Sequence, residues 1–133
     1  MKIVFAAIGL VASASLSAQG ASSAPTYLFF DWGKGELSSD ATAILDGVAE
    51  RYRAAPGAML IDGHSDRSGP AGPNIASSRK RAGQARDYLA AHGVPAAVMR
   101  VRAYGEAAPI IATEDGVREV QNRRVEIRFL AAQ

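Results

Sequence analysis

The sequence of 133 residues contains no cysteine. This absence excludes disulfide bonds, thiol catalysis, zinc–thiolate clusters and the lipid-bearing cysteine that a bacterial lipoprotein needs. An excess of one charge is also missing, because 15 basic and 13 acidic residues give a formal net charge of only +2. The chain therefore has no overall field that would attract nucleic acid, and any anion must be bound locally.

A long apolar run is found only at the amino terminus, from Ile3 to Leu16. It is shorter than the roughly 20 residues that a stable transmembrane helix needs. With Lys2 before it and small residues after it, the run predicts a secretory signal peptide at residues 1–20. Cleavage after Ser17 or after Gly20 fits the small-residue rule, and a retained membrane anchor is the alternative.

The remaining length supports a single domain. A chain of 133 residues with 48% hydrophobic content can form one core and hardly a second. We expect residues 21–25 to be a short polar lead-in and residues 26–133 to be the domain. We expect no transmembrane segment in the mature chain.

The first half of the domain reads as strand, helix, strand. Residues 26–31, TYLFFD, are aromatic and apolar and precede a glycine-containing loop, which is typical of a strand. One of residues 38–40 can cap a helix that runs to about Ala55. Residues 58–62, AMLID, form a continuous apolar run, which predicts a strand covered on both faces.

The second half adds a helix and two strands. Asn74 is a plausible N-cap for a helix through His92, with Gly93 as its left-handed terminator. Alternating residues predict strands at 98–105 and 123–130. The order β-α-β-α-β-β predicts an α+β fold, in which two helices pack on one face of a small mixed sheet.

The stretch DGHSDR, residues 62–67, carries the most unusual chemistry in the chain. Asp62, His64 and Asp66 alternate, so a continuing strand would place them on one side as metal ligands. The glycine break and the distance to His92, the only other histidine, argue against a metal site. The plainer interpretation is that the His64 ring hydrogen-bonds to nearby backbone and that Asp66 caps a turn.

Acid/base catalysis is the third interpretation of the same stretch. Ser65 and Ser68 are the nearest nucleophiles, but they lie in a glycine-rich turn with no nucleophile-elbow pattern. Neighbouring side chains on one short loop rarely have the geometry of a catalytic triad. The residues therefore favour a binding protein over an enzyme.

The helix after this loop carries a cluster of basic residues that helical geometry disperses. Arg79 and Arg81 flank the apolar stripe on different sides, and Lys80 lies almost opposite it. Arg81 lies at the edge of the core, near the point to which the loop after Asp66 returns. Two interpretations remain open: an internal Asp66–Arg81 salt bridge, or a split pair that holds a ligand with one cation and one anion.

The segment GHSDRSGPAGPNIASSRKRA, residues 63–82, resembles the signature of the OmpA-like carboxy-terminal domain. In that family Gly-His-Thr-Asp is followed by a glycine turn, an Asn and then Ser-x-x-Arg-Ala. Further matching blocks lie at 29–31, 104–109 and 122–127, so the resemblance covers about residues 26–130. The positions in register within the main segment are Gly63, His64, Asp66, Gly69, Asn74, Ser78, Arg81 and Ala82.

The resemblance implies non-covalent binding of peptidoglycan through the diaminopimelate of its stem peptide, without catalysis or a cofactor. It implies location in the periplasm, in association with peptidoglycan and the outer membrane. By matching, Asp66 takes the ligand's ammonium and Arg81 its carboxylate, which suits the two-bond fork of an arginine. The residues that the matching assigns to the supporting pocket are Asp31, Gly33, Ser65, Asn74 and Arg123.

A second function remains open, an adaptor that binds other envelope proteins. Residues 122–127, NRRVEI, place Arg124 and Glu126 opposite the apolar residues of the last strand. We interpret Arg124 and Arg128 as exposed charges on an edge strand. An adaptor would use this strand face for its partner and the pocket only incidentally.

Overall fold

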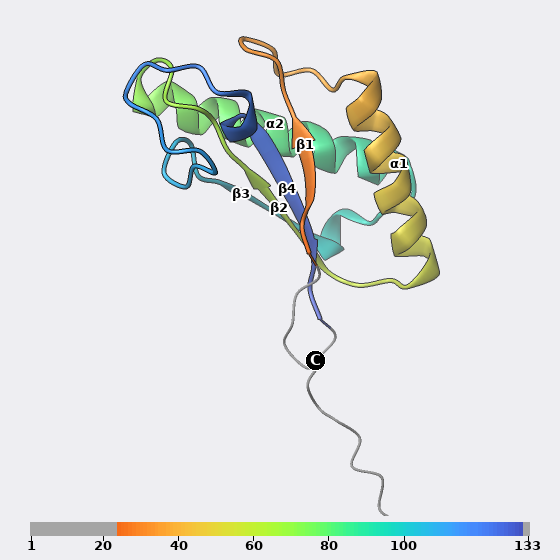
Figure 1. Ribbon diagram of the computed structural model, residues 1–133. Helices are drawn as coiled ribbons and strands as arrows, with labels where there is room; N and C mark the ends of the chain where they lie inside the picture. Colours follow the sequence, from red (N-terminus) through yellow and green to blue (C-terminus); the bar gives the residue numbers. More distant parts are fainter. Residues whose placement is uncertain (1–23, 132–133) are drawn as a thin grey trace, which may run out of the picture.

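The computed structural model describes residues 24–131 (Figure 1). Within that range, four strands form one mixed sheet, and the helices α1 and α2 lie on one of its faces. The predicted fold class and order of elements are confirmed. The predicted signal peptide lies outside the described residues, and no helix within them is long and apolar enough to cross a membrane.

The sheet has the strand order β1-β4-β2-β3. Its strands are β1 (Thr26–Phe29), β2 (Met59–Gly63), β3 (Met99–Ala103) and β4 (Arg124–Phe129). β4 pairs antiparallel with both β1 and β2, and β3 pairs parallel with β2. Strands β1, β2 and β3 therefore end at the same edge of the sheet, the edge at which β4 begins. In open α/β sheets ligands bind beyond the carboxyl ends of the strands, so the loops at this edge are the first place to look for a site.

Helix α1 (Ser39–Ala54) begins where its sequence predicts. The Ser38 hydroxyl accepts a hydrogen bond from the amide of Ala41 at 3.1 Å, which satisfies one free amide of the first turn. The buried face of α1 includes Leu45, Val48 and Ala49, whereas Ile44 is 40% exposed. The small side chain of Ala49 allows α1 to lie close to its neighbours.

Helix α2 (Ala71–Ala91) begins three residues before Asn74, so the predicted N-cap is wrong. Pro70 is the cap residue, and it makes no side-chain capping bond. Asn74 is instead a buried residue within the first turns, with its side chain free to bond other loops. The helix ends as predicted before Gly93, which has a φ of +96°.

The hydrophobic core lies between the two helices and the sheet face that they cover. It takes alternate residues from each strand and the inward stripe of each helix, as the period of each element requires. Its fully buried large side chains are Leu28, Leu45, Met59, Ile61, Leu89, Val94, Val125 and Ile127.

The opposite sheet face has no helix over it (Figure 1), but β2 is covered on both faces as predicted, since four of its five residues are buried. Leu60 is only half-buried there. On the same face Asp62 is buried beneath Arg102, whose guanidinium makes two hydrogen bonds of 2.7 Å to its carboxylate. The apolar run of β2 thus reflects a central strand with one apolar face and one face covered by a paired arginine.

Strand β4 is central, so the predicted edge strand is wrong. Arg124 is 4% exposed, and its guanidinium donates to Glu126 and to the carbonyl of Ala108, each at 2.8 Å. Arg128 is half-buried. Alternation along the strand identifies the two faces correctly, but it does not reveal that a connecting loop covers the charged one.

Strand β2 and helix α2 approach most closely at Gly63. A Cβ atom on Gly63 would overlap the carbonyl group of Ser78 and lie 3.2 Å from the Cβ of Ala82. The Ser78 hydroxyl also accepts a hydrogen bond from the amide of Gly105 at 3.0 Å. This contact holds α2 against the sheet at the end of β2, just before the chain enters the loop that carries Asp66.

We expect Gly63→Ala to lower the free energy of unfolding by about 1–3 kcal/mol or more, because the new methyl group must push α2 off the sheet. Urea unfolding measures the change. Gly57→Ala is the matched control, since nothing lies within 4 Å of a Cβ there. Equal stability of both variants would contradict the close packing of α2 on β2.

Candidate functional site

Three connecting segments meet at the edge where β1, β2 and β3 end. Backbone hydrogen bonds continue beyond the strands and fix these segments: Phe30 N donates to Arg123 O at 3.0 Å, and His64 N donates to Arg124 O at 2.8 Å. The amide of Ser65 donates to the Gly105 carbonyl at 2.8 Å. The loop after β2 is therefore bonded on both sides before it turns toward α2.

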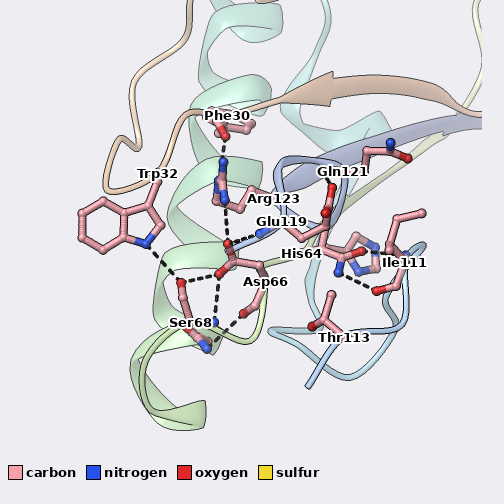
Figure 2. A network of polar contacts seen from close by, with 12 residues as sticks. Phe30, Trp32, His64, Asp66, Ser68, Ile111, Thr113, Glu119, Gln121 and Arg123 are labelled. Carbon is pink, nitrogen blue, oxygen red and sulfur yellow. Dashed lines mark hydrogen bonds and ion pairs between the residues drawn. The ribbon is translucent and has the colours of Figure 1, made fainter. Parts of the chain in front are cut away.

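The carboxylate of Asp66 lies at the centre of these segments (Figure 2). Its Oδ1 accepts bonds from the hydroxyl and the amide of Ser68, at 2.5 and 3.1 Å. Its Oδ2 accepts from Nη1 of Arg123 at 2.6 Å and from the amide of Glu119 at 3.0 Å. Asp66 is only 2% exposed, and these four donors use the four acceptor positions of a carboxylate.

The surroundings of Asp66 hold its pKa below the ordinary value of an aspartate. Burial by itself would raise this pKa, because it penalises the charged form. The hydrogen bonds from Ser68, Arg123 and the Glu119 amide outweigh burial and stabilise the carboxylate. Asp66 is therefore negatively charged at neutral pH.

Arg123, which the sequence matching placed in a supporting role, is the direct partner of Asp66. The two side chains form a buried salt bridge, with exposures of 9% for Arg123 and 3% for Asp66. Arg123 is held from the other side as well, since its Nε donates to the Phe30 carbonyl at 2.9 Å. The internal Asp66–Arg81 salt bridge that the sequence left open is absent from the described residues.

Arg81 is buried beside this pair without a carboxylate of its own. It is 6% exposed, and its Nη1 makes one long hydrogen bond of 3.4 Å to the His64 carbonyl. Its guanidinium carbon lies 5.5 Å from the centre of the Phe30 ring. Within residues 24–131 its Nε has no hydrogen-bond partner. Burial and the charge of Arg123 lower the pKa of Arg81, and the charge of Asp66 partly offsets them.

A cavity of about 190 Å³ opens on the two guanidinium groups. A second hollow, of about 130 Å³, shares Gly33, Ser77 and Arg81 with it and extends toward Lys80. Both hollows are lined by positively charged side chains. Asp66 does not line the larger one and lies behind its wall. The residues that line the larger of the two are Trp32, Gly33, Ser68, Gly69, Ser77, Arg81 and Arg123.

Two of the predicted supporting residues lie beneath the cavity and hold its loop. The Ser65 hydroxyl donates to the Asn74 carbonyl at 3.1 Å. The side-chain amide of Asn74 donates to the Asp66 carbonyl at 3.2 Å and to Glu106 at 3.0 Å. The Ser65 bond ties the loop to α2, and the Asn74 side chain, which comes from α2, fixes the backbone at Asp66.

The other two supporting residues behave differently from one another. Gly33 lines the cavity with a φ of +71°, a backbone conformation that favours glycine. Asp31 is exposed and lines a separate hollow of about 550 Å³ beside α1, together with Phe29 and Leu37. The structure brings Asp66, Arg81, Gly33 and Arg123 together and leaves the Asp31 side chain apart.

Sequence reasoning did not single out Trp32, and it considered Ser68 only as a nucleophile. The indole Nε1 of Trp32 donates to the Ser68 hydroxyl at 3.1 Å (Figure 2). The guanidinium of Arg118 lies 3.3 Å from the centre of an indole ring. The Asp-x-Ser spacing is typical of a turn in which Asp accepts a hydrogen bond from the residue two positions on. The contact between Ser68 and Asp66 could therefore have been predicted from the sequence.

His64 is buried on the sheet face that no helix covers, away from the cavity. Its ring stacks on Tyr104 with centroids 5.0 Å apart. Neither ring nitrogen has a hydrogen-bond partner among the described residues, so the predicted bond to backbone is wrong. Burial, and then the charge of Arg124, lower its pKa. Residues 24–131 contain no group of three His, Cys, Asp or Glu side chains that would hold a metal ion.

A sequence profile described as the OmpA family matches residues 29–123 of this chain. The chain is 32% identical over 114 residues to the peptidoglycan-associated lipoprotein of Pseudomonas putida, a match that covers 86% of this chain and 69% of that protein. It is 37% identical over 98 residues to the peptidoglycan-associated lipoprotein of Rhizobium meliloti (strain 1021), covering 73% of this chain and 56% of that one.

The fold is similar to that of a solved relative. The crystal structure of the peptidoglycan-associated lipoprotein from Burkholderia pseudomallei matches with a TM-score of 0.72 and 27% sequence identity. The match covers 79% of this chain and 89% of that chain.

We expect Asp66→Asn to lower the free energy of unfolding by about 3–5 kcal/mol at pH 7, because Arg123 is left buried without an anion. The unfolded pKa is about 3.9 and the folded pKa is lower, so the wild-type advantage is complete above the unfolded value. It is lost as the pH falls through the folded value.

Urea unfolding at pH 7 and at pH 3 or below measures this difference. Asp115→Asn is the control, because Asp115 pairs with Arg67 but is 84% exposed and contributes little. A stability difference between wild type and Asp66→Asn that did not shrink in acid would contradict the role given to the charged carboxylate.

Proposed function

This chain belongs to the OmpA family, and we propose that it binds peptidoglycan non-covalently, without catalysis, in the bacterial cell envelope. The names of the relatives support this, since both are called peptidoglycan-associated. The location that goes with it is the periplasm, next to peptidoglycan and the outer membrane. The relatives are also called lipoproteins, whereas this sequence contains no cysteine to carry a lipid.

One observation carries the proposal: Arg81 is a buried cation at a cavity wall with no anionic partner of its own. A buried arginine is normally paired with a carboxylate, but Asp66, the carboxylate whose charge acts on Arg81, is already bonded to Arg123. Repulsion from Arg123 adds to the cost of the unpaired charge. A ligand carboxylate in the cavity would satisfy Arg81 and lie near both guanidinium groups.

The finer part of the proposal is that the ligand group is the diaminopimelate of the stem peptide. Diaminopimelate presents a free amino-carboxylate end, a cation and an anion on one carbon. Its carboxylate can bond Arg81 through two parallel hydrogen bonds, and its ammonium can bond Asp66. Arg81 lines the cavity, where a ligand carboxylate would arrive first. Asp66 is 2% exposed and lies deeper, behind the cavity wall.

Such a site gives modest affinity for one ligand unit. Each charge-assisted hydrogen bond contributes about 1.5–3 kcal/mol net, so a few of them support a Kd of roughly micromolar to millimolar. Peptidoglycan repeats the same group many times, so a protein that dissociates is surrounded by further sites. Retention at the wall then follows from rebinding.

We expect the protein to sediment with purified sacculi of the diaminopimelate type and Arg81→Ala to bind them about tenfold to a hundredfold more weakly, since one charge-assisted contact is lost. Arg81→Lys is expected to recover little, because an ammonium lacks the planar fork. The protein remaining in the supernatant over a series of sacculus concentrations gives the affinity.

Arg79→Ala is the matched control, an exposed arginine two residues away on the same helix. Loss of binding in this variant too would indicate non-specific attraction by positive charge. Pelleting that Arg81→Ala leaves unchanged would contradict the cavity as the binding site. A defined envelope protein that still binds the double variant Asp66→Ala, Arg81→Ala in a pull-down would favour an adaptor acting through the open sheet face. Muropeptides released during incubation would contradict binding without catalysis.

A further inference from the structure

The hydroxyl of Ser68 fills a position at Asp66 that a ligand would need. Its Oγ lies 2.5 Å from Oδ1 of Asp66 and accepts the indole N–H of Trp32 at 3.1 Å (Figure 2). Both Ser68 and Trp32 line the cavity that opens on Arg81. The carboxylate lies just behind them and is 2% exposed. A cation that enters the cavity therefore meets Ser68 and Trp32 before it meets Asp66.

Of the four donors to Asp66, three are fixed in place. Two are backbone amides, those of Ser68 and Glu119, and cannot leave unless the chain moves. The third, Arg123, is buried and bonded to the Phe30 carbonyl as well. The fourth, the Ser68 hydroxyl, can swing away by rotation about a single side-chain bond. It is the donor that an incoming ammonium can replace at the lowest cost.

We propose that the Ser68 hydroxyl occupies the ammonium subsite on Asp66, that Trp32 holds it there, and that this pair sets the preference of the pocket between zwitterionic and purely anionic ligands. The inference rests on the proposed binding of an amino-carboxylate group at this cavity. It adds that the site is occupied from within and that ligand selection includes a competition with Ser68.

The two halves of the ligand then bind under different conditions. A carboxylate reaches Arg81 from the open cavity and displaces no protein group, because the Arg81 Nε has no partner within the described residues. An ammonium must break the Ser68–Asp66 bond, which is strengthened by the carboxylate charge, and the Trp32–Ser68 bond with it. The affinity for a zwitterion is reduced by that competition, while the affinity for an anion is not.

Trp32 is suited to hold the hydroxyl. Its indole is 49% exposed and is fixed at two points, by the N–H bond to Ser68 and by the Arg118 guanidinium 3.3 Å from a ring centre. Arg118 lies next to Glu119, whose amide bonds Asp66, so the same segment that binds the carboxylate also positions the indole. Trp32 is the only tryptophan in the sequence, so tryptophan fluorescence reports on this one side chain.

The test uses two soluble probes of equal length, meso-diaminopimelate and pimelate, which lacks the amino groups. Calorimetric titration compares wild type with Ser68→Ala, with Trp32→Phe and with the control Ser39→Ala, an exposed serine at the start of α1. We expect Ser68→Ala to bind diaminopimelate about tenfold to a hundredfold more tightly and pimelate unchanged, since a hydrogen bond to a charged group no longer competes.

We expect Trp32→Phe to tighten diaminopimelate binding as Ser68→Ala does, by a smaller factor, and to leave pimelate binding unchanged. Ser39→Ala should change neither affinity. Fluorescence gives a second readout. Diaminopimelate should shift the emission of Trp32 in wild type and pimelate should not, because only the ammonium displaces Ser68. Unliganded Ser68→Ala should already differ in emission from unliganded wild type.

The two hypotheses fail differently. If wild type binds diaminopimelate and Ser68→Ala binds it equally or more weakly, this inference is overturned and the proposed function remains intact. Binding by Ser68→Ala alone would support the inference, because the internal hydroxyl then keeps the wild-type subsite closed. No binding of either probe by wild type and by Ser68→Ala would overturn the proposed function and this inference with it.

Discussion

The arrangement of the site depends on one buried carboxylate, that of Asp66. A charge taken out of water is stable only if it is fully hydrogen-bonded, and here the four donors come from three different segments. Ser68 belongs to the loop after β2, Glu119 to the connection between β3 and β4, and Arg123 to the start of β4. Through Ser68 the contact extends to Trp32 in the loop after β1. The large apolar side chains between β3 and β4 are exposed, so a polar centre holds this connection in place.

The two arginines next to Asp66 have separate roles. Arg123 is used internally, because it neutralises Asp66 and bonds the Phe30 carbonyl. Arg81 comes from α2, shares the burial and the positive environment, and lacks an anion. The fold satisfies one cation and leaves the other facing a cavity. This difference, more than the mere presence of Asp66 and Arg81, makes the site a candidate for binding a carboxylate.

Much of the fold could be predicted from local pattern. Alternation in the last strand identified Val125, Ile127 and Phe129 as the inward set, and these residues are buried. Ser38 was among the expected caps because a hydroxyl before an apolar periodic run has one common use. The error at Asn74 arose from the same rule, since Asn is a frequent cap. The proline–alanine start of α2 lies earlier, and Asn74 bonds the loop instead.

The pairing within the site could not be predicted in the same way. Asp66 and Arg123 are 57 residues apart in the sequence, and only the strand order brings the start of β4 beside the end of β2. The buried state of Arg124 depends on a connecting loop that covers it, which strand periodicity does not reveal. Trp32 stands in no pattern that indicates a contact with Ser68. Spacing along the chain identifies candidate groups, and the tertiary fold decides which of them are already satisfied.

The most direct measurement is a crystal structure of the protein with meso-diaminopimelate bound. The account predicts a ligand carboxylate within hydrogen-bond distance of the Arg81 Nε and an ammonium at Oδ1 of Asp66, with the Ser68 hydroxyl rotated away. It also predicts that the Asp66–Arg123 salt bridge remains intact. A ligand bound elsewhere would contradict this arrangement of the site. So would a complex in which the Asp66–Arg123 salt bridge is broken, the ligand contacts Arg123 and Arg81 has no anion.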